Sequence, residues 1–510
     1  MIKLLFVSPR SASLLLDEAG DYALPAPVSL SLREGDGAFV PLGEENRSVI
    51  SLFGLKPETD YVLSSGKDHI SFRTGAESFT LDVRRFGAKG DGVTDDTPAL
   101  QAAILACPAD GRVLVPAGVY RTGPLFLKSH ITLDLSRGAE LALLTDRARF
   151  PVLPGVTFPT QAGGKDLFLG SFEGNPLDSY ASALTGIGVE DVRILGEGVV
   201  DGRGPESDWW THPKAKIGAW RGHLLFLEDC RDITVQGVTF RNSPCWNIHP
   251  LCSENLTFVD IRVEAPANSP NTDGFDPQSC RGVRLWGARF SVGDDCIAIK
   301  SGKIYLGMKC PMPSEDIEIA WCAMLDGHGG VTVGSEMSGG VRNVRVHHCW
   351  MRGNDRGLRV KTRRGRGKYA VIDDILFEDV RMEGVKAPLV VNAMYFCDPD
   401  GHSPYVQSRE PQPIDDGTPT IGSIVYRRVR AEACQACVAY ILGLPERPVR
   451  EVCLEDCSFT FLPEASAMAP AMAEGVEPCH HRGIIARFID SLRLEAVSMR
   501  GVEGPETDLS

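Results

Sequence analysis

The sequence contains no long hydrophobic run. No stretch approaches the roughly 20 consecutive apolar residues that a membrane-spanning helix needs. The apolar run at residues 4–7 is also shorter than the core of a secretory signal, which spans roughly 7–15 residues. We therefore interpret this run as a first strand, and we expect no membrane partner.

An excess of positive charge and a fixed glycine period are also missing. The chain has 53 Lys and Arg against 67 Asp and Glu, a formal net charge of −14. This balance argues against a protein whose main ligand is nucleic acid, so any polyanion must meet a local basic patch. The 53 Gly and 34 Pro follow no regular period, which excludes collagen and indicates a fold rich in turns.

The 15 cysteines are odd in number and scattered through predicted strands, which favours reduced thiols over a disulfide framework. We therefore expect a cytoplasmic protein, with a periplasmic or secreted location as the alternative if a leader has been removed. Cys434 and Cys437, followed by Cys453 and Cys457, have a spacing near that of zinc sites. Because Cys453 lies inside a predicted strand and Cys457 begins the next, we favour packing and expect no metal.

Residues 1–78 read as a small β-sandwich. Short alternating segments at residues 28–32, 49–53 and 70–72 are separated by Gly, Pro and Asp-Gly turn signals. Residues 55–61 resemble the tyrosine corner of a fibronectin type III domain, with Tyr61 as the corner residue. A generic hairpin is the alternative, and neither interpretation brings visible chemistry.

An internal near-repeat runs through residues 79–510. Pairs of apolar residues flanking one variable residue recur at intervals of 23 to 49 residues, which indicates a unit of a little over 20 residues with inserted loops. The pairs are Val192/Ile194, Ile233/Val235, Leu256/Phe258, Val283/Leu285, Ile317/Ile319, Val344/Val346, Ile375/Phe377, Ile424/Tyr426, Val452/Leu454 and Leu492/Leu494.

This repeat predicts a right-handed parallel β-helix. A propeller needs roughly 40 residues per blade, more than the tightest intervals allow, and the fixed ladder of leucine-rich repeats is absent. Only residues 97–107 show a helical period, and we expect this helix to cap the open end of the solenoid. The predicted fold class is therefore all-β: a fibronectin-like sandwich followed by a parallel β-helix.

Three carboxylates are spaced to meet on one face of such a helix. Asp273 and Asp294 are 21 residues apart, about one uninterrupted coil, and Asp295 follows directly. Stacked coils bring equivalent positions to about one strand spacing, ~4.8 Å. Like charges at that distance raise at least one pKa, which is the arrangement that one acid and one base require.

Two further motifs follow in order along the chain. His328 is flanked by glycines that allow a ligand to approach closely. Arg359 and Lys361 alternate with apolar residues, so both are expected on one face, where they suit a sugar carboxylate. Taken singly, each motif has an ordinary structural interpretation as a turn, a structural histidine or a solvated face. Their order and coil-compatible spacing are what carry the prediction.

Together these motifs resemble glycoside hydrolase family 28, the polygalacturonases. The motifs are residues 271–273 (Asn-Thr-Asp), 293–295 (Gly-Asp-Asp), 327–329 (Gly-His-Gly) and 359–361 (Arg-Val-Lys, where the family often has Ile at Val360). Residues 86–96 look like the opening of pectin-degrading β-helices, and residues 242–250 are similar to the bacterial and plant exo-type branch. The likeness covers about residues 80–500, and a fibronectin-like domain also precedes the β-helix in bacterial exo-polygalacturonases.

The resemblance implies hydrolysis of α-1,4 bonds in polygalacturonate or oligogalacturonides, with inversion and without a cofactor or metal. It implies that Asp294 is the general acid, that Asp273 and Asp295 hold and deprotonate the attacking water, and that His328 supports the protonation state of the acid.

For substrate binding, the resemblance implies that Arg359 and Lys361 hold the galacturonate carboxylate, with Asn271 and Tyr395 as further contacts. The insertions before Ile233 and between Phe377 and Ile424 would form walls that make the enzyme exo-acting.

Two further features of the sequence have open interpretations. Seven basic residues crowd residues 356–368, either as a funnel for a polyanion or as a solvated loop; they are Arg356, Arg359, Lys361, Arg363, Arg364, Arg366 and Lys368. Trp209 and Trp210 either stack on sugars or pack internally.

Three functional alternatives remain open: a calcium-dependent pectate lyase, a hydrolase of rhamnogalacturonan or xylogalacturonan, and a non-catalytic polysaccharide-binding β-helix. The sequence leaves the oligomeric state undetermined.

Overall fold

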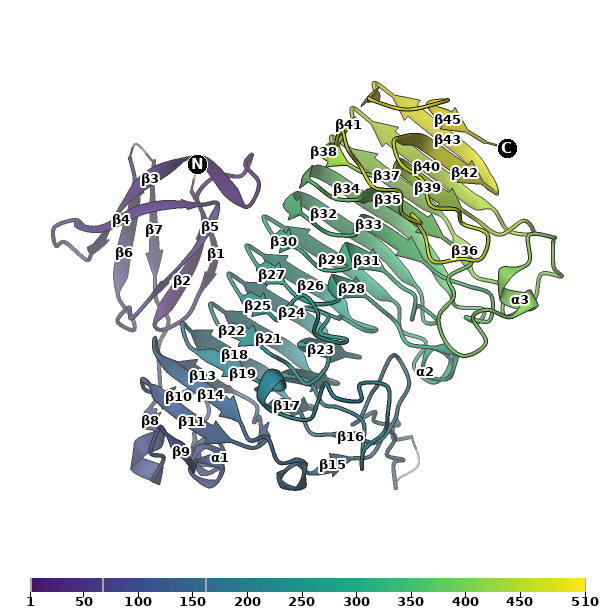
Figure 1. Ribbon diagram of the computed structural model, residues 1–510. Helices are drawn as coiled ribbons and strands as arrows, with labels where there is room; N and C mark the ends of the chain where they lie inside the picture. Colours follow the sequence, from purple (N-terminus) through teal and green to yellow (C-terminus); the bar gives the residue numbers. More distant parts are fainter. Residues whose placement is uncertain (1, 67, 161–162, 510) are drawn as a thin grey trace.

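The computed structural model describes residues 2–66, 68–160 and 163–509. A small β-sandwich lies beside a long stack of β-coils (Figure 1). Strands dominate throughout, as the composition of the repeats predicts.

The sandwich consists of two antiparallel sheets. One contains β1 (Lys3–Val7), β2 (Ser11–Leu15) and β5 (Val49–Phe53), and the other β3 (Ala23–Glu34), β4 (Val40–Arg47), β6 (Asp60–Ser65) and β7 (Asp68–Arg73). Leu14, Leu63 and Tyr61 are buried between them. The Tyr61 hydroxyl accepts a hydrogen bond from the Lys56 backbone N–H at 2.9 Å, so the predicted tyrosine corner is present.

The coils form three columns of parallel strands. The first column contains β8 (Thr80–Asp82), β10 (Gly111–Val115), β13 (Ile131–Leu135), β18 (Glu190–Gly196), β21 (Arg231–Gln236), β24 (Glu254–Val259), β26 (Arg281–Trp286), β29 (Ser314–Ala320), β32 (Val341–Arg352), β34 (Val371–Glu383), β36 (Thr420–Ile421), β37 (Ser423–Arg427), β40 (Val449–Glu455) and β43 (Ile489–Glu495).

The second column continues each coil after a bend, and β32 and β34 run through both columns. Its strands are β9 (Asp91–Asp95), β11 (Gly118–Thr122), β14 (Ala139–Leu143), β19 (Val199–Asp201), β22 (Thr239–Arg241), β25 (Arg262–Glu264), β27 (Arg289–Ser291), β30 (Ala323–Leu325), β38 (Arg430–Cys434), β41 (Ser458–Phe461) and β44 (Ser498–Arg500).

The third column carries the candidate site. It contains β12 (Leu125–Phe126), β17 (Leu184–Ile187), β20 (Leu225–Glu228), β23 (Ile248–Leu251), β28 (Asp295–Ile299), β31 (Gly329–Val333), β33 (Arg356–Lys361), β35 (Ala387–Asn392), β39 (Cys437–Leu442), β42 (Arg482–Arg487) and β45 (Thr507–Asp508). Phe275 bridges Ile248 on one side and Ile297 on the other, which joins the coils that hold the acidic motifs.

All ten predicted apolar pairs stack on one another in the first column. Val192 pairs with Ile233, Ile233 with Leu256, and the ladder continues in register to Leu492. Except for Leu494 of the last pair, which is exposed, their side chains join or pack against one continuous core cluster inside the helix. The predicted parallel β-helix is therefore confirmed, with the apolar pairs before the last coil facing inward.

A second ladder, which the sequence prediction did not use, lies one residue before most of these pairs. Asp191, Asp232, Asn255, Asp316 and Asn343 all have positive φ angles between 48° and 57°. Asn and Asp tolerate this left-handed conformation better than other non-glycine residues. Each lies inside its strand at a position that the ladder of paired residues skips, and the Asn255 amide donates to the Asp232 carboxylate at 3.1 Å.

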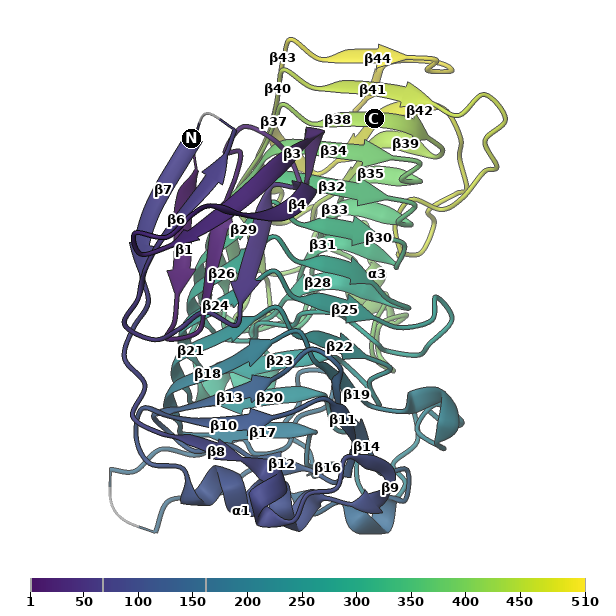
Figure 2. The same cartoon turned by 90° about the vertical axis from the view of Figure 1, so that its left-hand side faces the viewer.

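The predicted cap helix is confirmed as α1 (Thr97–Ala106), at the end of the stack where the coils begin (Figure 2). Leu100, Ala103 and Ile104 face the core and cover its first coil. The other helical segments are α2 (Ile304–Lys309), α3 (Pro404–Gln407), η1 (Val83–Phe86), η2 (Arg147–Arg149) and η3 (Gly204–Glu206), and an antiparallel pair joins β15 (Val152–Leu153) to β16 (Ser179–Tyr180). Within the described part of the chain, no helix has the length and apolar character that crossing a membrane requires.

The sandwich packs on the flank of the first column. Leu15 and Val49 form a cluster with Val259, Ala320 and Trp321 of the β-helix. Arg47 also pairs with Asp260 at 2.5 Å, and Arg381 pairs with Asp21 at 2.7 Å.

Gly287 permits the close approach of the two bodies. A Cβ at this position would lie 2.4 Å from the Cβ of Val49. The glycine also has a φ of +64°, which a side chain would strain. The contact between sandwich and β-helix therefore depends on the absence of a side chain at residue 287.

Candidate active site

One cavity brings together all eight residues that the sequence predicts for the site. Its volume is about 410 Å³, and among its lining residues are Asn271, Asp273, Asp294, Asp295, His328, Arg359, Lys361 and Tyr395. They come from neighbouring coils of the third column, whose stacking turns long sequence separations into contacts. The residues thus meet as predicted, while the role of each remains a prediction.

The three carboxylates converge at the centre of the cavity. Oxygen atoms of Asp273, Asp294 and Asp295 all lie within 4.8 Å of one another. The backbone sets this arrangement, because the Gly274 N–H donates to the Asp295 carbonyl at 3.0 Å across the two coils. Gly293 is required before the pair, since a Cβ there would lie 2.3 Å from the Ser269 carbonyl oxygen.

Three cations surround this cluster. Lys361 Nζ lies 2.8 Å from Asp295 Oδ2, and Arg359 lies 3.5 Å from Asp295 Oδ1. Lys300 Nζ contacts Asp273 at 3.2 Å and Asp276 at 3.0 Å. All three basic side chains are nearly fully buried, so their charges act in a medium that screens them weakly.

These surroundings shift the pKa values of Asp273 and Asp295 in opposite directions. Burial raises the pKa of Asp273 well above its usual range, and Asp294 and Asp295 add to this while Lys300 opposes it. Burial also acts to raise the pKa of Asp295, but Lys361 and Arg359 outweigh it and hold that pKa below its usual range. Asp295 is therefore fixed as a carboxylate, and Asp273 takes up a proton more readily than Asp295 does.

His328 lies at the mouth of the cavity beside the central carboxylate. Its Nδ1 is 3.4 Å from Asp294 Oδ1, and its backbone N–H donates to the Asp294 carbonyl at 3.0 Å. The hydrogen bond to Asp294 raises the pKa of His328 more than burial lowers it. Since the imidazole is more than half exposed, it can exchange protons with solvent and with Asp294.

The substrate-binding residues form a group next to the acids. The Tyr395 ring lies 5.3 Å from the Arg359 guanidinium and 5.1 Å from Lys361 Nζ, which orients both cations. Asn271 Oδ1 accepts a hydrogen bond from the Arg221 guanidinium at 2.8 Å. The planar guanidinium and the neighbouring ammonium suit a carboxylate ligand.

Several residues that line the cavity are not among those that the sequence predicts for the site. One is Lys300, which lies in the same strand motif as Asp294 and Asp295. Another is Trp246, whose ring centroid is 3.4 Å from Lys300 Nζ. Glu336 is a further buried carboxylate, whose pKa Lys300, Lys303, Lys361 and Arg366 hold at about 2 against the effect of burial. The alternation of residues 297–300 is the sequence feature that could have predicted Lys300 on the cavity side, because it places Lys300 on the face opposite the apolar Ile297 and Ile299.

The crowded basic segment is neither a funnel nor a solvated loop as a whole. Arg356, like the predicted pair at 359 and 361, lines the cavity. Arg363 instead binds Asp400 at 2.5 Å, and Arg364 binds Glu446 at 2.7 Å while donating to three backbone carbonyls. Burial of these guanidinium groups requires such partners, so they anchor neighbouring loops. Lys368 is exposed and lies over the Tyr369 ring.

The two adjacent tryptophans serve packing. Trp209 is 1% exposed and meets Phe150 and Tyr180 edge to face. The Trp210 indole donates to the Ser243 carbonyl at 3.0 Å. The interpretation of Trp209 as a sugar-stacking residue is therefore wrong; Trp210 is partly buried, and Trp246 is the tryptophan that lines the cavity.

Loops outside the coils wall the cavity. The two insertions that the sequence predicts as walls contribute Lys214 and the group Phe396, Cys397 and Asp398, while residues 154–178 add Glu173 and residues 462–481 add Met472. The walls are tied to one another: the Lys303 backbone N–H donates to the Gly174 carbonyl at 2.9 Å, and its ammonium binds Asp398 at 2.5 Å.

All fifteen cysteines are free thiols, as predicted. Cys457 Sγ donates to the Tyr426 carbonyl and Cys453 Sγ to the Glu455 carboxylate, consistent with packing along the coils. Two groups of three or more metal-ligating side chains occur among the described residues, and neither contains a cysteine.

A parallel β-helix that presents three converging carboxylates opposite a fixed arginine and lysine defines a β-helical glycoside hydrolase. A family model described as Glycosyl hydrolases family 28 matches residues 170–469, and a model described as rhamnogalacturonase A/epimerase, pectate lyase-like, matches residues 80–134. The first covers more than half of the chain. The protein therefore belongs to glycosyl hydrolase family 28.

Individual relatives agree with this assignment. A probable polygalacturonase of Vitis vinifera is 33% identical over 379 residues, which are 73% of this chain and 72% of that protein. The crystal structure of a hyperthermoactive exopolygalacturonase from Thermotoga maritima aligns with a TM-score of 0.65 at 27% identity, covering 84% of this chain and 93% of that one. A family 28 exopolygalacturonase of Yersinia enterocolitica shares the fold over 100% of this chain and 98% of its own, with a TM-score of 0.70 at 17% identity.

Proposed function

We propose that the protein hydrolyses the α-1,4 bonds of polygalacturonate and oligogalacturonides and releases galacturonic acid from the chain end. The observation that carries this proposal is the cluster of Asp273, Asp294 and Asp295 beside Arg359 and Lys361 in one cavity. The carboxylates supply acid and base, and the two cations offer a site for the acid group of the sugar. The names of the similar proteins support the same substrate.

In the proposed reaction, Asp294 acts as the general acid and donates a proton to the leaving oxygen. Asp273 and Asp295 hold a water molecule and accept its proton as it attacks the anomeric carbon from the opposite face. Asp295 is a poor nucleophile because Lys361 and Arg359 engage its oxygens, which favours attack by water and inversion over a covalent intermediate. His328 then passes a proton from solvent to Asp294, and the base releases to solvent the proton that it took from the water.

The loops that enclose the cavity support exo action. Loops from both ends of the stack contribute to one cavity, and the contacts of Lys303 join residue 174 to Asp398 in a continuous side. An endo-acting enzyme requires a groove through which a polymer passes in both directions. In the cytoplasm, the substrate would be short oligogalacturonides.

Product analysis tests the proposal. Trigalacturonate and polygalacturonate are incubated with the protein in the presence of a chelator, and the products are separated by chromatography. Saturated monogalacturonate at the earliest times is expected, and NMR should show the β-anomer first. A ladder of mixed oligomers would overturn exo action, and an initial α-anomer would overturn inversion.

The same assay separates the alternatives. The three clustered carboxylates would be the calcium ligands of a lyase, which would yield unsaturated products only when calcium is restored. Cleavage confined to rhamnogalacturonan or xylogalacturonan would point to another pectin backbone. Binding without cleavage of any of them would indicate a non-catalytic β-helix.

A further inference from the structure

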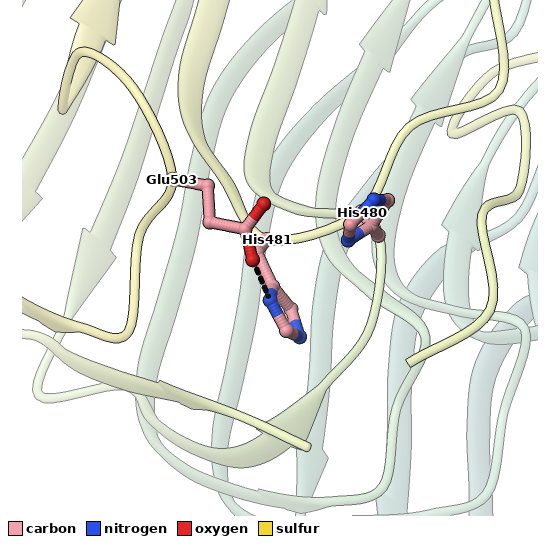
Figure 3. A group of neighbouring side chains, drawn as sticks. All are labelled: His480, His481 and Glu503. Carbon is pink, nitrogen blue, oxygen red and sulfur yellow. Dashed lines mark hydrogen bonds and ion pairs between the residues drawn. The ribbon is translucent and has the colours of Figure 1, made fainter. Parts of the chain in front are cut away.

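A group of three metal-ligating side chains lies at the C-terminal end of the stack, away from the residues that line the cavity. His480 and His481 precede β42, and Glu503 lies in the turn before β45 (Figure 3). One ligand atom from each lies within 4.8 Å of the others. The Glu503 backbone N–H donates to the His481 carbonyl at 2.7 Å, so the turn is held against the histidines.

The hydrogen bonds of His481 show which nitrogen faces the group. Its Nε2 lies 2.8 Å from the Leu462 carbonyl, which only accepts hydrogen bonds, so the proton of the neutral ring is on Nε2. The lone pair on Nδ1 then points at Glu503 Oε1, 2.9 Å away. Two acceptors at that distance must have a proton or a metal ion between them, so the same geometry suits a protonated imidazole or a bound ion.

This orientation matches the usual support of a metal-bound histidine. Ligating imidazoles commonly donate their other N–H to a backbone carbonyl, which fixes the ring and its tautomer. The His481 side chain is only 11% exposed, so its ring is held before any ion arrives. His480 and Glu503 are exposed and free to adjust.

The backbone explains how the side chains of two adjacent histidines come to lie beside each other. Neighbours in an extended chain project to opposite sides. His481, however, has a φ of +50°, which turns the chain between them. The two rings therefore lie edge to face with their centroids 5.1 Å apart.

We propose that His480, His481 and Glu503 bind one late first-row divalent metal ion, with Zn²⁺ as the prototype and water in the remaining position. Two imidazoles and one carboxylate are a donor set that Zn²⁺ accepts, whereas Ca²⁺ and Mg²⁺ prefer oxygen ligands alone. Zinc bonds of ~2.0–2.2 Å to nitrogen and oxygen fit between Nδ1 and Oε1 after a small widening of their separation.

The ion would fasten the base of a loop that reaches the active site. Leu462 begins and His481 ends the segment whose Met472 lines the cavity. The Met472 carbonyl accepts hydrogen bonds from the Asn392 amide at 3.0 Å and from the Phe396 N–H at 3.1 Å. A metal at residues 480, 481 and 503 therefore ties this wall to the last coil.

Titration of the chelator-treated, full-length protein with ZnCl₂ tests the site by calorimetry. We expect one zinc ion per chain and a thermal midpoint that rises with zinc concentration. His480→Gln and Glu503→Gln change exposed side chains, so both variants should fold and lose at least about tenfold in affinity. His69→Gln removes an exposed histidine from the sandwich and should bind as the unaltered protein does.

Absence of saturable binding would overturn the proposal. So would equal affinity in His480→Gln, Glu503→Gln and the unaltered protein, since the zinc would then bind elsewhere. Because binding and thermal shift need no turnover, the result is independent of the proposed hydrolase activity.

Discussion

At the scale of single residues, the site separates its carboxyl groups by the cations beside them. Asp295 has two buried cations and stays ionised, whereas Asp273 has one and takes up a proton more readily. Without Lys300, Lys361 and Arg359, three carboxylates within 4.8 Å would repel one another and hold more protons. The basic residues therefore set the acid–base state as well as binding substrate.

Replacing the proposed acid should abolish most turnover. For Asp294→Asn we expect kcat on trigalacturonate to fall by roughly 10²–10⁴-fold, the usual contribution of a general acid, with an intact fold. Asp36→Asn, an exposed change in the sandwich, serves as the control and should leave kcat unchanged. Turnover by Asp294→Asn at the rate of the unaltered protein would point to a contaminating enzyme or another acid.

We expect Lys300 to affect the pH dependence of kcat/KM by lowering the pKa of Asp273. Its ammonium lowers the pKa of Asp273, so Lys300→Met should raise that pKa further. Since the base must be ionised, activity is present above its pKa, and the acid limb of kcat/KM should move to higher pH by roughly 1–3 units.

Lys309→Met, the same change at an exposed position of α2, is the matched control for this shift. A uniform loss of activity in Lys300→Met with an unchanged pH profile would mean that the lysine has only a structural role.

At the scale of elements, the short-range pattern of the sequence predicts the coils better than it predicts the loops. The apolar pairs, the cap helix and the tyrosine corner were predictable because each depends on neighbours in one coil or one turn. The eight site residues were predictable as a cluster because stacking in register follows from the repeat. Met472 and Glu336 were not, since nothing in the repeat places an insertion relative to a coil.

The basic segment shows the same limit of local patterns. Arg359 and Arg364 look alike in sequence, yet the first lines the cavity and the second is buried against Glu446. The difference arises from loop 393–419, whose backbone carbonyls at residues 405, 406 and 408 accept hydrogen bonds from Arg364. Its acceptors lie more than forty residues along the chain, so periodicity cannot reveal them.

Loss of the Arg364 side chain should therefore destabilise the protein strongly. Arg364→Met leaves Glu446, only 4% exposed, as an unpaired buried charge, which costs about 3–5 kcal/mol of unfolding free energy. Arg493→Met breaks the exposed pair with Glu495 and should leave stability nearly unchanged. Urea unfolding of both variants measures the difference, and equal stabilities would refute the structural role of Arg364.

At the scale of the whole molecule, the sandwich is part of a single packed structure. Its contact with the β-helix combines the apolar cluster around Trp321 with the ion pairs of Arg47 and Arg381. Of these contacts, the apolar cluster is the buried part, whereas Arg381 is partly exposed.

A methyl group at Gly287 should disturb this contact. Gly287→Ala places a Cβ 2.4 Å from that of Val49, and such overpacking costs about 1–3 kcal/mol. Gly188→Ala introduces the same strain, at a φ of +60°, where no atom lies within 4 Å. We expect the thermal midpoint of Gly287→Ala to fall further than that of Gly188→Ala. Equal thermal midpoints in the two glycine variants would contradict this expectation and show that the sandwich can shift to make room for the methyl group.

The order of the coils along the chain has a consequence for synthesis. The three carboxylates are complete once residue 295 has left the ribosome, and Lys361 follows 66 residues later. Met472, which completes the wall, follows Arg359 by 113 residues, and translation adds ~5–20 residues per second. A nascent chain therefore carries its acids well before it can enclose a sugar.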